Sequence, residues 1–245
     1  MALGLGASLG KTGLITPGVV TDNLVMKHMY PAGAVQPLSD GAVYFDGSDS
    51  YISASTLTFT DSMSFCMWVR SDASASGAIL TSYEDASNAV TIGIYGNKVD
   101  ARFIGANTIQ RASGTWTHQA WNHIACVCDS GTADTGLTVY INGVVSTTST
   151  SNSLGIADAT GTVMGARKQS SAYDYDFEGY VCNMGVWNDL LTQPEIKSIM
   201  WKQYADLTTG TDSESDDLIN WWALDEGEGT SVADSKGSLT GALTA

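Results

Sequence analysis

Three carboxylates recur at alternate positions of the run 174–178, Asp-Tyr-Asp-Phe-Glu, and are the best candidates for chemistry in this sequence. On an extended strand, Asp174, Asp176 and Glu178 would share one face, with neighbours about 6.6 Å apart. Retaining glycosidases hold two carboxyl groups about 5–5.5 Å apart, and inverting enzymes about 6.5–9.5 Å apart. The spacing therefore permits glycoside hydrolysis, but it equally permits a carbohydrate or cation site, or a solvated acidic edge.

A second acidic cluster, which also includes Glu226, stands near the end of the sequence. Calcium prefers carboxylate and carbonyl oxygens, so Asp225, Glu228 and Asp234 are candidate metal ligands. The cluster lacks the alternating oxygen ligands and the closing Glu of an EF-hand loop, which favours a structural turn. Calcium is the one cofactor that the sequence suggests, and it stays an open alternative.

Trp116 stands in a stretch rich in Ser, Gly and Thr and is the candidate for an exposed ring on which a sugar could stack. Packing at the edge of the core is the alternative for this ring. The histidines, His28, His118 and His123, are scattered, and the sequence contains neither a nucleophile elbow nor a Gly-rich phosphate loop. We therefore expect a protein without enzymatic activity.

The formal net charge of −15 excludes partners that need clustered Lys and Arg, namely nucleic acids and anionic membranes. No apolar run approaches the ~20 residues that span a bilayer, and the first residues lack the basic start of a secretory signal. We expect synthesis in a cytosol, where the four cysteines would be reduced and buried.

The elements that would position these residues are mostly strands, because apolar residues alternate with polar or small ones in run after run. Residues 121–144 are the clearest case. They predict two strands and then Asn142-Gly143, a dipeptide that suits a tight hairpin turn. Residues 42–52 predict a strand pair joined by an Asp-Gly turn.

One helix is expected after these strands, because Thr192 and Glu195 form a capping box with Pro194 in the first turn. An apolar stripe continues from this helix as far as Leu207. The sequence thus predicts an all-β sandwich over residues 41–245, with one short helix.

Residues 1–40 differ from the rest, with three of the four prolines, several glycines and no sustained periodicity. Such a segment cannot build a core of its own, yet its leucines and valines make it too apolar for a solvated tail. We expect an extended N-terminal arm that docks on a neighbouring subunit, and therefore a homo-oligomer.

Four blocks of the sequence carry a family resemblance. They are A-V-Y-F-D-G-S-D-S-Y-I, M-S-F-C-M-W-V-R, W-N-H-I-A with V-Y-I-N-G, and F-E-G-Y-V-C-N-M-G-V-W-N-D-L-L-T-Q-P-E-I. In this order they resemble laminin-G-like, concanavalin A-like jelly rolls, over residues 41–236. The resemblance implies a jelly-roll β-sandwich that either binds sugars or serves as a scaffold. Related jelly-roll glucanases use Glu-x-Asp-x-Glu with Glu as nucleophile where this chain has Asp174, which counts against catalysis.

Two departures from the family pattern matter. Cys182-Asn183 stands where the family often has an Asp that helps to hold calcium. Residues 221–237, W-W-A-L-D-E-G-E-G-T-S-V-A-D-S-K-G, resemble a family segment that usually precedes the F-D-G strand. Jelly-roll termini lie close together, so a strand can move from one end of the chain to the other. We expect residues 221–224 to pair beside the strand that holds Phe45.

The opening M-A-L-G-L-G and the run T-P-G-V-V-T-D-N-L-V ahead of F-D-G resemble structural proteins of marine tailed phages. The resemblance implies a non-enzymatic virion protein, made in the host cytoplasm, that serves as capsid decoration, fibre or tail adhesion module. Its arm would contact other virion proteins, and its jelly roll would meet a host-surface glycan. The alternative is a calcium-assisted carbohydrate-binding lectin module.

Overall fold

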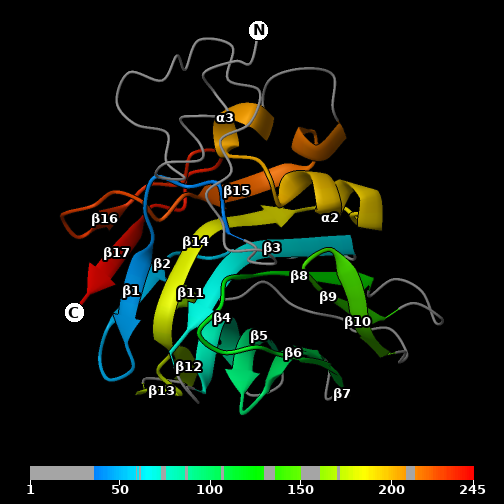
Figure 1. The fold of residues 1–245 in the computed structure, drawn as a ribbon. Coiled ribbons are helices and arrows are strands. Elements are labelled where there is room, and N and C mark those ends of the chain that lie inside the picture. Colours follow the sequence, from blue (N-terminus) through cyan, green and yellow to red (C-terminus); the bar gives the residue numbers. More distant parts are fainter. Residues whose placement is uncertain are drawn as a thin grey trace, which may run out of the picture. The chain divides into compact units, whose positions relative to one another are not determined.

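The described residues of the computed structural model are built mainly from antiparallel strands. The described ranges are 36–58, 60, 62–72, 76–85, 88–105, 108–129, 136–149, 161–169, 172–207 and 213–245. Apart from 36–40, the expected arm lies outside these residues. Most of the described strands belong to two sheets that face each other (Figure 1). The expectation of an all-β sandwich is confirmed.

The first sheet contains seven of the described strands, each antiparallel to its neighbour. In spatial order, six of them are β1 (Val43–Asp46), β14 (Glu178–Trp187), β3 (Ser62–Ser71), β8 (Asn122–Asp129), β9 (Leu137–Ile141) and β10 (Val144–Ser149). The seventh, β15 (Leu218–Trp222), also pairs with β14. Because β3 lies along one side of β14, strands β1 and β15 share the other side.

The second sheet contains eight of the described strands. Their order is β16 (Ser231–Val232), β17 (Gly241–Thr244), β2 (Tyr51–Ala54), β11 (Gly161–Met164), β4 (Gly77–Asp85), β5 (Asn88–Tyr95), β6 (Lys98–Gly105) and β7 (Thr108–Thr115). A separate small hairpin consists of β12 (Arg167–Gln169) and β13 (Ala172–Asp174). This hairpin leads directly into the run that carries the candidate carboxylates.

Alternation of side chains along β3 and β8 divides the apolar residues of the first sheet between its two faces. Phe65, Met67 and Ile124 belong to the main core between the sheets. Cys66 and Ala125 belong to a smaller apolar cluster that includes residues of the helix. The first sheet is therefore buried on both faces over part of its area.

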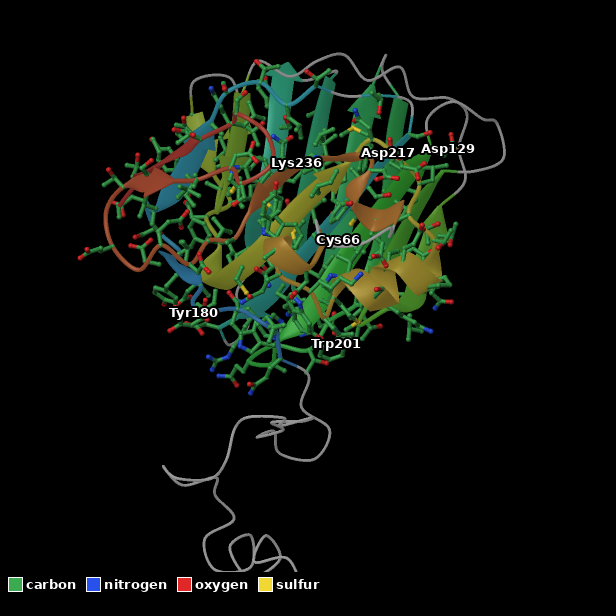
Figure 2. The ribbon with its side chains drawn as sticks, turned by 90° about the horizontal axis from the view of Figure 1, so that it is seen from above. Cys66, Asp129, Tyr180, Trp201, Asp217 and Lys236 are labelled. Atoms are coloured by element: carbon green, nitrogen blue, oxygen red, sulfur yellow. The ribbon has the colours of Figure 1, made fainter. Side chains whose placement is uncertain are left out.

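The face of the first sheet that points away from the main core is covered by α2 (Gln193–Ile199). α3 (Tyr204–Leu207) and a 3-10 turn, η1 (Ser213–Ser215), follow this helix in the chain. Figure 2 looks onto this face, with Cys66 near the middle and Trp201 toward one side. None of the described helices is long and apolar enough to span a bilayer.

The start of α2 confirms the expected capping box. The Thr192 side chain accepts a hydrogen bond from the Glu195 backbone N–H, and the Glu195 carboxylate accepts one from the Thr192 N–H at 2.7 Å. The helix ends at Ile199, so the expected continuous stripe to Leu207 is wrong. Leu207 belongs to α3, yet it is buried in the same apolar cluster as Ile199.

Two expected turns have different outcomes. Asn142 and Gly143 join β9 to β10 with φ values of 52° and 71°, the left-handed pair that a tight hairpin requires, so this prediction is confirmed. The strand pair expected over residues 42–52 is wrong, because β1 lies in the first sheet and β2 in the second. The Asp-Gly turn after Asp46 carries the chain from one sheet to the other.

The strands near the C-terminus, β15 and β17, lie in the same sheets as the first two strands, β1 and β2. β15 joins the sheet that contains Phe45, as expected, but its hydrogen-bonded partner is β14 and not β1. β1 pairs with the first half of β14 and β15 with the second half, so the two strands follow each other along one edge. β17 pairs with β2 in the second sheet.

Candidate functional site

The run 174–178 does not form one strand. β13 ends at Asp174, Tyr175 adopts a left-handed conformation with φ 51°, and β14 begins at Glu178. The turn is anchored on β4, because the Ala78 N–H donates to the Tyr175 carbonyl at 2.7 Å. The expectation that three carboxylates share one strand face is therefore wrong, since a left-handed residue interrupts the alternation.

Asp174 is engaged in a two-point ion pair across the β12–β13 hairpin. Arg167 donates from Nε to Oδ1 at 2.8 Å and from its terminal nitrogen to Oδ2 at 2.6 Å. The hydrogen bonds that Arg167 donates to Asp174 also raise the pKa of Arg167. The guanidinium lies over the Tyr175 ring, 4.1 Å from the ring centre, as a cation–π contact.

Two pairs of tyrosines involve residues on either side of Asp174, and we call their four members the tyrosine face: Tyr51, Tyr95, Tyr173 and Tyr175. Tyr173 stacks on Tyr51 with ring centres 4.1 Å apart, and Tyr175 lies 5.5 Å from Tyr95 in a tilted arrangement. Tyr173 is 37% exposed and Tyr175 is 46% exposed. The sequence reasoning missed this group, although two of its members alternate with the acidic residues of the run.

The other two candidate carboxylates differ in their surroundings. Asp176 is half-buried beside the turn, and burial raises its pKa, with further contributions from the charges of Asp174 and Asp46. Glu178 is exposed at the start of β14, opposite Asp46 on β1. Hydrogen bonds from the Ser50 and Ser48 hydroxyls lower the pKa of Asp46. The Asp46 carboxylate therefore stabilises the turn that joins the two sheets.

Asp234 is a structural residue and not a free metal ligand. Its Oδ1 accepts from the backbone N–H groups of Trp221 at 3.0 Å and Gly237 at 2.9 Å. Its Oδ2 accepts from Asn220 Nδ2 at 2.6 Å and the Leu239 N–H at 2.9 Å. Burial alone would raise the pKa of Asp234, but these hydrogen bonds outweigh it and hold the pKa below its usual value. The carboxylate ties β15 to the segment that leads into β17.

The remaining members of the second acidic cluster do not complete a calcium site. The Glu226 Oε1 accepts from the Ala233 N–H at 2.8 Å, and Glu228 is exposed. Among the described residues, no three His, Cys, Asp or Glu side chains are placed to hold one metal ion. The contacts of Asp234 agree with the structural turn that the sequence favours over a metal site at Asp225, Glu228 and Asp234, because both Asp234 oxygens accept hydrogen bonds from backbone N–H groups.

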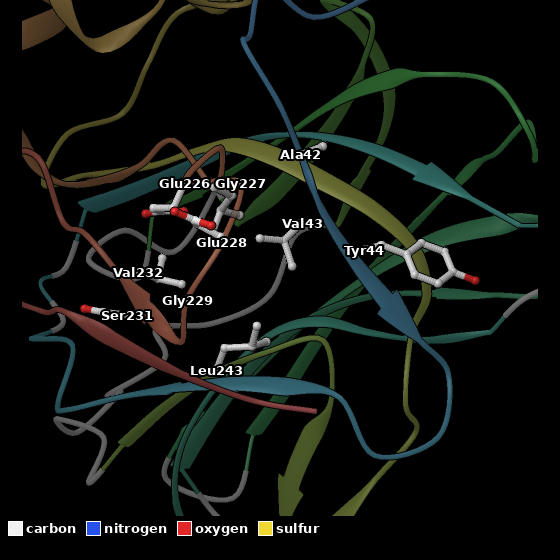
Figure 3. A pocket seen from close by; sticks show the side chains of 11 residues that line it. Ala42, Val43, Tyr44, Glu226, Gly227, Glu228, Gly229, Ser231, Val232 and Leu243 are labelled. Carbon is white, nitrogen blue, oxygen red and sulfur yellow. The ribbon is translucent and has the colours of Figure 1, made fainter.

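Glu226 and Glu228 do line a pocket of about 210 Å³ between β1 and the β16–β17 hairpin. Figure 3 shows the two glutamates together on one side of Val43 and Leu243. The Glu226 Oε2 atom is buried and has no hydrogen-bond partner among the described residues. This pocket combines apolar walls with one carboxylate oxygen, and it adjoins the open edge of the sandwich.

Trp116 is not an exposed platform. Its side chain is 4% exposed and packs in the main core, and its indole N–H donates to the Ser71 hydroxyl at 3.0 Å. The alternative interpretation, packing at the edge of the core, is confirmed. His123 is also buried, and its pKa falls to about 3 because burial penalises the charged ring. Neither residue can meet a ligand at the surface.

Comparison with known proteins agrees with this fold. The family model Laminin_G_3, described as the concanavalin A-like lectin/glucanases superfamily, matches residues 46–197. A candidate carbohydrate-binding protein from Bacteroides ovatus is 18% identical, with a TM-score of 0.60 over 83% of this chain and 58% of that chain. A heptameric SAP-like pentraxin from Limulus polyphemus is 16% identical, with a TM-score of 0.52 over 81% and 93%.

The CBM40 of a Ruminococcus gnavus IT-sialidase, bound to α2,3-sialyllactose, is 11% identical, with a TM-score of 0.53 over 65% of this chain and 96% of that chain. At these identities the structures share the fold alone, and the chain spans little more than half of the Bacteroides protein. No curated protein sequence matches this chain. Since the family model covers more than half of the residues and the sandwich agrees with it, the chain belongs to the concanavalin A-like lectin/glucanase superfamily.

Proposed function

We propose that this protein is a non-enzymatic carbohydrate-binding module whose ligand stacks on the tyrosine face. The observation that carries the proposal is the exposure of Tyr173 and Tyr175 beside hydrogen-bonding charged groups. A sugar ring presents an apolar face to an aromatic ring and hydroxyl groups to its surroundings, so both kinds of partner are needed together. Arg167 lies over the Tyr175 ring and Asp176 directly follows Tyr175 in the chain, so these two residues are the candidate polar partners.

The hydrogen bonds and the relative placement of the three carboxylates favour binding without catalysis. A glycosidase needs one carboxyl group that donates a proton and a second that is free to act as nucleophile or base. Both oxygens of Asp174 accept hydrogen bonds from Arg167, so neither is free to act as nucleophile or base. The left-handed Tyr175 separates Asp174 from Asp176, so the run lacks the strand alignment on which the catalytic alternative depended.

We propose that the binding does not require calcium. The acidic residues near the C-terminus do not fit the ion, since Asp234 is saturated by N–H donors. A glycan array tests the proposal: wild-type protein should give a signal that survives EDTA, and the signal should be lost in Tyr175→Ala. A signal that disappears in EDTA would support the calcium-assisted alternative, and the absence of any signal across a broad array would overturn the carbohydrate proposal.

A second candidate function is that of a virion structural protein of a tailed phage, with the jelly roll as decoration, fibre or adhesion module. It is motivated by the sequence of the first forty residues, most of which lie outside the described part of the structure. In this proposal the arm contacts other virion proteins, the chain forms a homo-oligomer, and the tyrosine face meets a host-surface glycan.

Mass spectrometry of purified phage particles tests the virion proposal. Many copies per portal would indicate capsid decoration, and a small multiple of the tail symmetry would indicate a tail or fibre position. Absence of the protein from the particles would overturn this proposal without affecting the proposed carbohydrate binding.

A further inference from the structure

The first sheet ends at β10, and we call the outer side of this strand the β10 edge. Among the described strands, β10 pairs with β9 alone, and it lies at the margin of the sandwich, across the molecule from β17 (Figure 1). In an antiparallel ladder, the N–H and C=O groups of alternate residues point to opposite neighbours. β10 therefore keeps part of its backbone hydrogen-bonding capacity for a strand on its other side.

The side chains along β10 are open to solvent. Val144 is 58% exposed and Val145 is 47% exposed, and Ser146 and Thr148 are exposed as well. All six residues of the strand are valine, serine or threonine, so none is charged and none is proline. An exposed strand of this composition is a template for pairing with a further strand.

The other margins of the two sheets differ from β10. Folded proteins guard a sheet edge with charged side chains, with very short strands or with a segment that covers it. Among the described strands, β1 carries Asp46, β7 contains Arg111, and β16 has two residues. The β15 backbone has a further partner, because the Trp221 carbonyl accepts from the Ser235 N–H at 2.7 Å. β10 has neither a charge nor such a cover among the described residues.

The pairing of β10 with β9 contains a bulge, which can itself discourage a further strand. This bulge lies between Val145 and Thr147, in the half of the strand that follows the turn. Beyond it, residues 147–149 pair with β9 one by one. The second half of β10 is therefore the part that can accept a partner strand in regular register.

The charge of the chain indicates which partner fits this edge. With a formal net charge of −15, copies of the protein repel one another. The longest uncharged run of the sequence extends from Thr135 to Ala157 and contains both β9 and β10. Two copies can therefore approach at the β10 edge with little electrostatic cost, and the free backbone groups of one β10 are complementary to those of the other.

The described contacts hold β10 in its extended form. The Gly143 carbonyl in the turn before it accepts from the Gln193 side chain on α2 at 2.9 Å. The Ser146 side chain lies against Gly114 on β7. A strand that is fixed in this way loses little conformational entropy when it pairs, which favours association.

We propose that the β10 edges of two copies pair in antiparallel orientation about a two-fold axis and join their first sheets into one. Such a contact uses the same residues on both copies. It does not depend on carbohydrate binding, because no member of the tyrosine face lies on β9 or β10. A standard interface takes about 20–30 residues from each partner. β10 has six, so the dimer is weak and reversible.

Sedimentation velocity of the full chain between about 10 μM and 1 mM tests this proposal. We expect monomer at the low end and dimer at the high end, with tighter association at higher salt because the repulsion between carboxylates is screened. Amide hydrogen exchange at both concentrations locates the contact, since the β10 amides should exchange several-fold more slowly in the dimer. A chain that stays monomeric throughout would overturn the proposal, and so would β10 exchange rates that do not change with concentration.

Variants of Thr148 separate the β10 edge from every other surface, the N-terminal arm included. Thr148→Lys brings like charges together across the two-fold axis and should weaken the dimer about tenfold or more. Thr148→Asp should do the same, which excludes a new attraction between the lysine and the acidic surface. The matched controls, Thr244→Lys and Thr244→Asp, make the same changes at an exposed position of β17 and should leave the association unchanged. Dimers of wild-type strength in the Thr148 variants would overturn the proposal.

Discussion

The Arg167 guanidinium lies over the ring of Tyr175, 4.1 Å from its centre, while it holds both oxygens of the neighbouring Asp174. One cation thus neutralises a carboxylate and supports an exposed aromatic ring. Arginine suits this double role because its planar group can pair with a carboxylate and stack on a ring at the same time. Tyr175 is accordingly presented to solvent in a fixed position, which is what an aromatic binding surface requires.

Replacement of Tyr175 by alanine should reduce glycan binding at least tenfold, because stacking and the cation–π support are lost together. Tyr44→Ala is the matched control, since Tyr44 is similarly exposed, at 43% against 46%, but lies on β1 away from the turn. Surface plasmon resonance with an array-selected glycan measures both variants. Equal losses in the two variants would show that the tyrosine face is not the site.

Removal of the Asp234 carboxylate should destabilise the sandwich by roughly 3 kcal/mol or more, because several backbone N–H groups lose their acceptor at once. Urea unfolding of Asp234→Ala against Asp217→Ala, an exposed control, measures the difference. The lowered pKa fixes the sign of the pH effect: the stabilisation is present above the ordinary value of 3.8 and is lost as pH falls below it. A variant as stable as the control would contradict this role.

The strand periodicity, the hairpin at Asn142-Gly143 and the capping box at Thr192 could be predicted because each depends on neighbouring residues only. The contacts of Trp116 and Asp234 could not be predicted, and their alternatives stayed open, because their partners are remote in sequence. The Trp116 indole donates to Ser71, 45 positions away, and Asp234 accepts from Trp221, 13 positions away. A short-range pattern cannot distinguish a buried ring in a polar loop from an exposed one.

The tyrosine face was missed for the same reason. Tyr175 lies in the acidic run 174–178 and Tyr173 directly precedes it, but Tyr51 and Tyr95 come from other strands. The left-handed turn at Tyr175 depends on its hydrogen bond to Ala78 on β4, which no local pattern reveals. The acidic residues mark the turn beside which these tyrosines lie, and contacts with residues remote in sequence determine which side chains that turn exposes.

His123 should make the protein less stable in mild acid. Burial lowers its folded pKa to about 3, whereas an unfolded histidine titrates near 6.5, so between these values only the unfolded chain takes up the proton. Stability should therefore fall by about 2 kcal/mol between pH 7 and pH 5 through this residue. Denaturation of wild type and His123→Gln across this range measures it, and an equal slope in both would contradict the assignment.

The four cysteines should not react with a thiol reagent in the folded protein. All four are free and buried, which confirms the expectation of reduced, buried thiols, and burial raises the pKa of Cys128 and of Cys182 to about 12. A thiol in this state is neither nucleophilic nor accessible. Ellman's reagent should label none without denaturant and all four in guanidinium. Rapid labelling of the native chain would show that one of them is open to solvent.

The shared edge of β14 has a consequence for biosynthesis. A ribosome delivers β1 and β2 before the other described strands, whereas β15 and β17, which pair with β14 and β2, follow all the other strands of the first sheet and most of the second. Until residues 218–244 have emerged, the nascent chain exposes the apolar side chains that these strands cover. Closure of the sandwich therefore waits for these residues, and a chain cut short before β15 would present unpaired strand edges to aggregation or to chaperones.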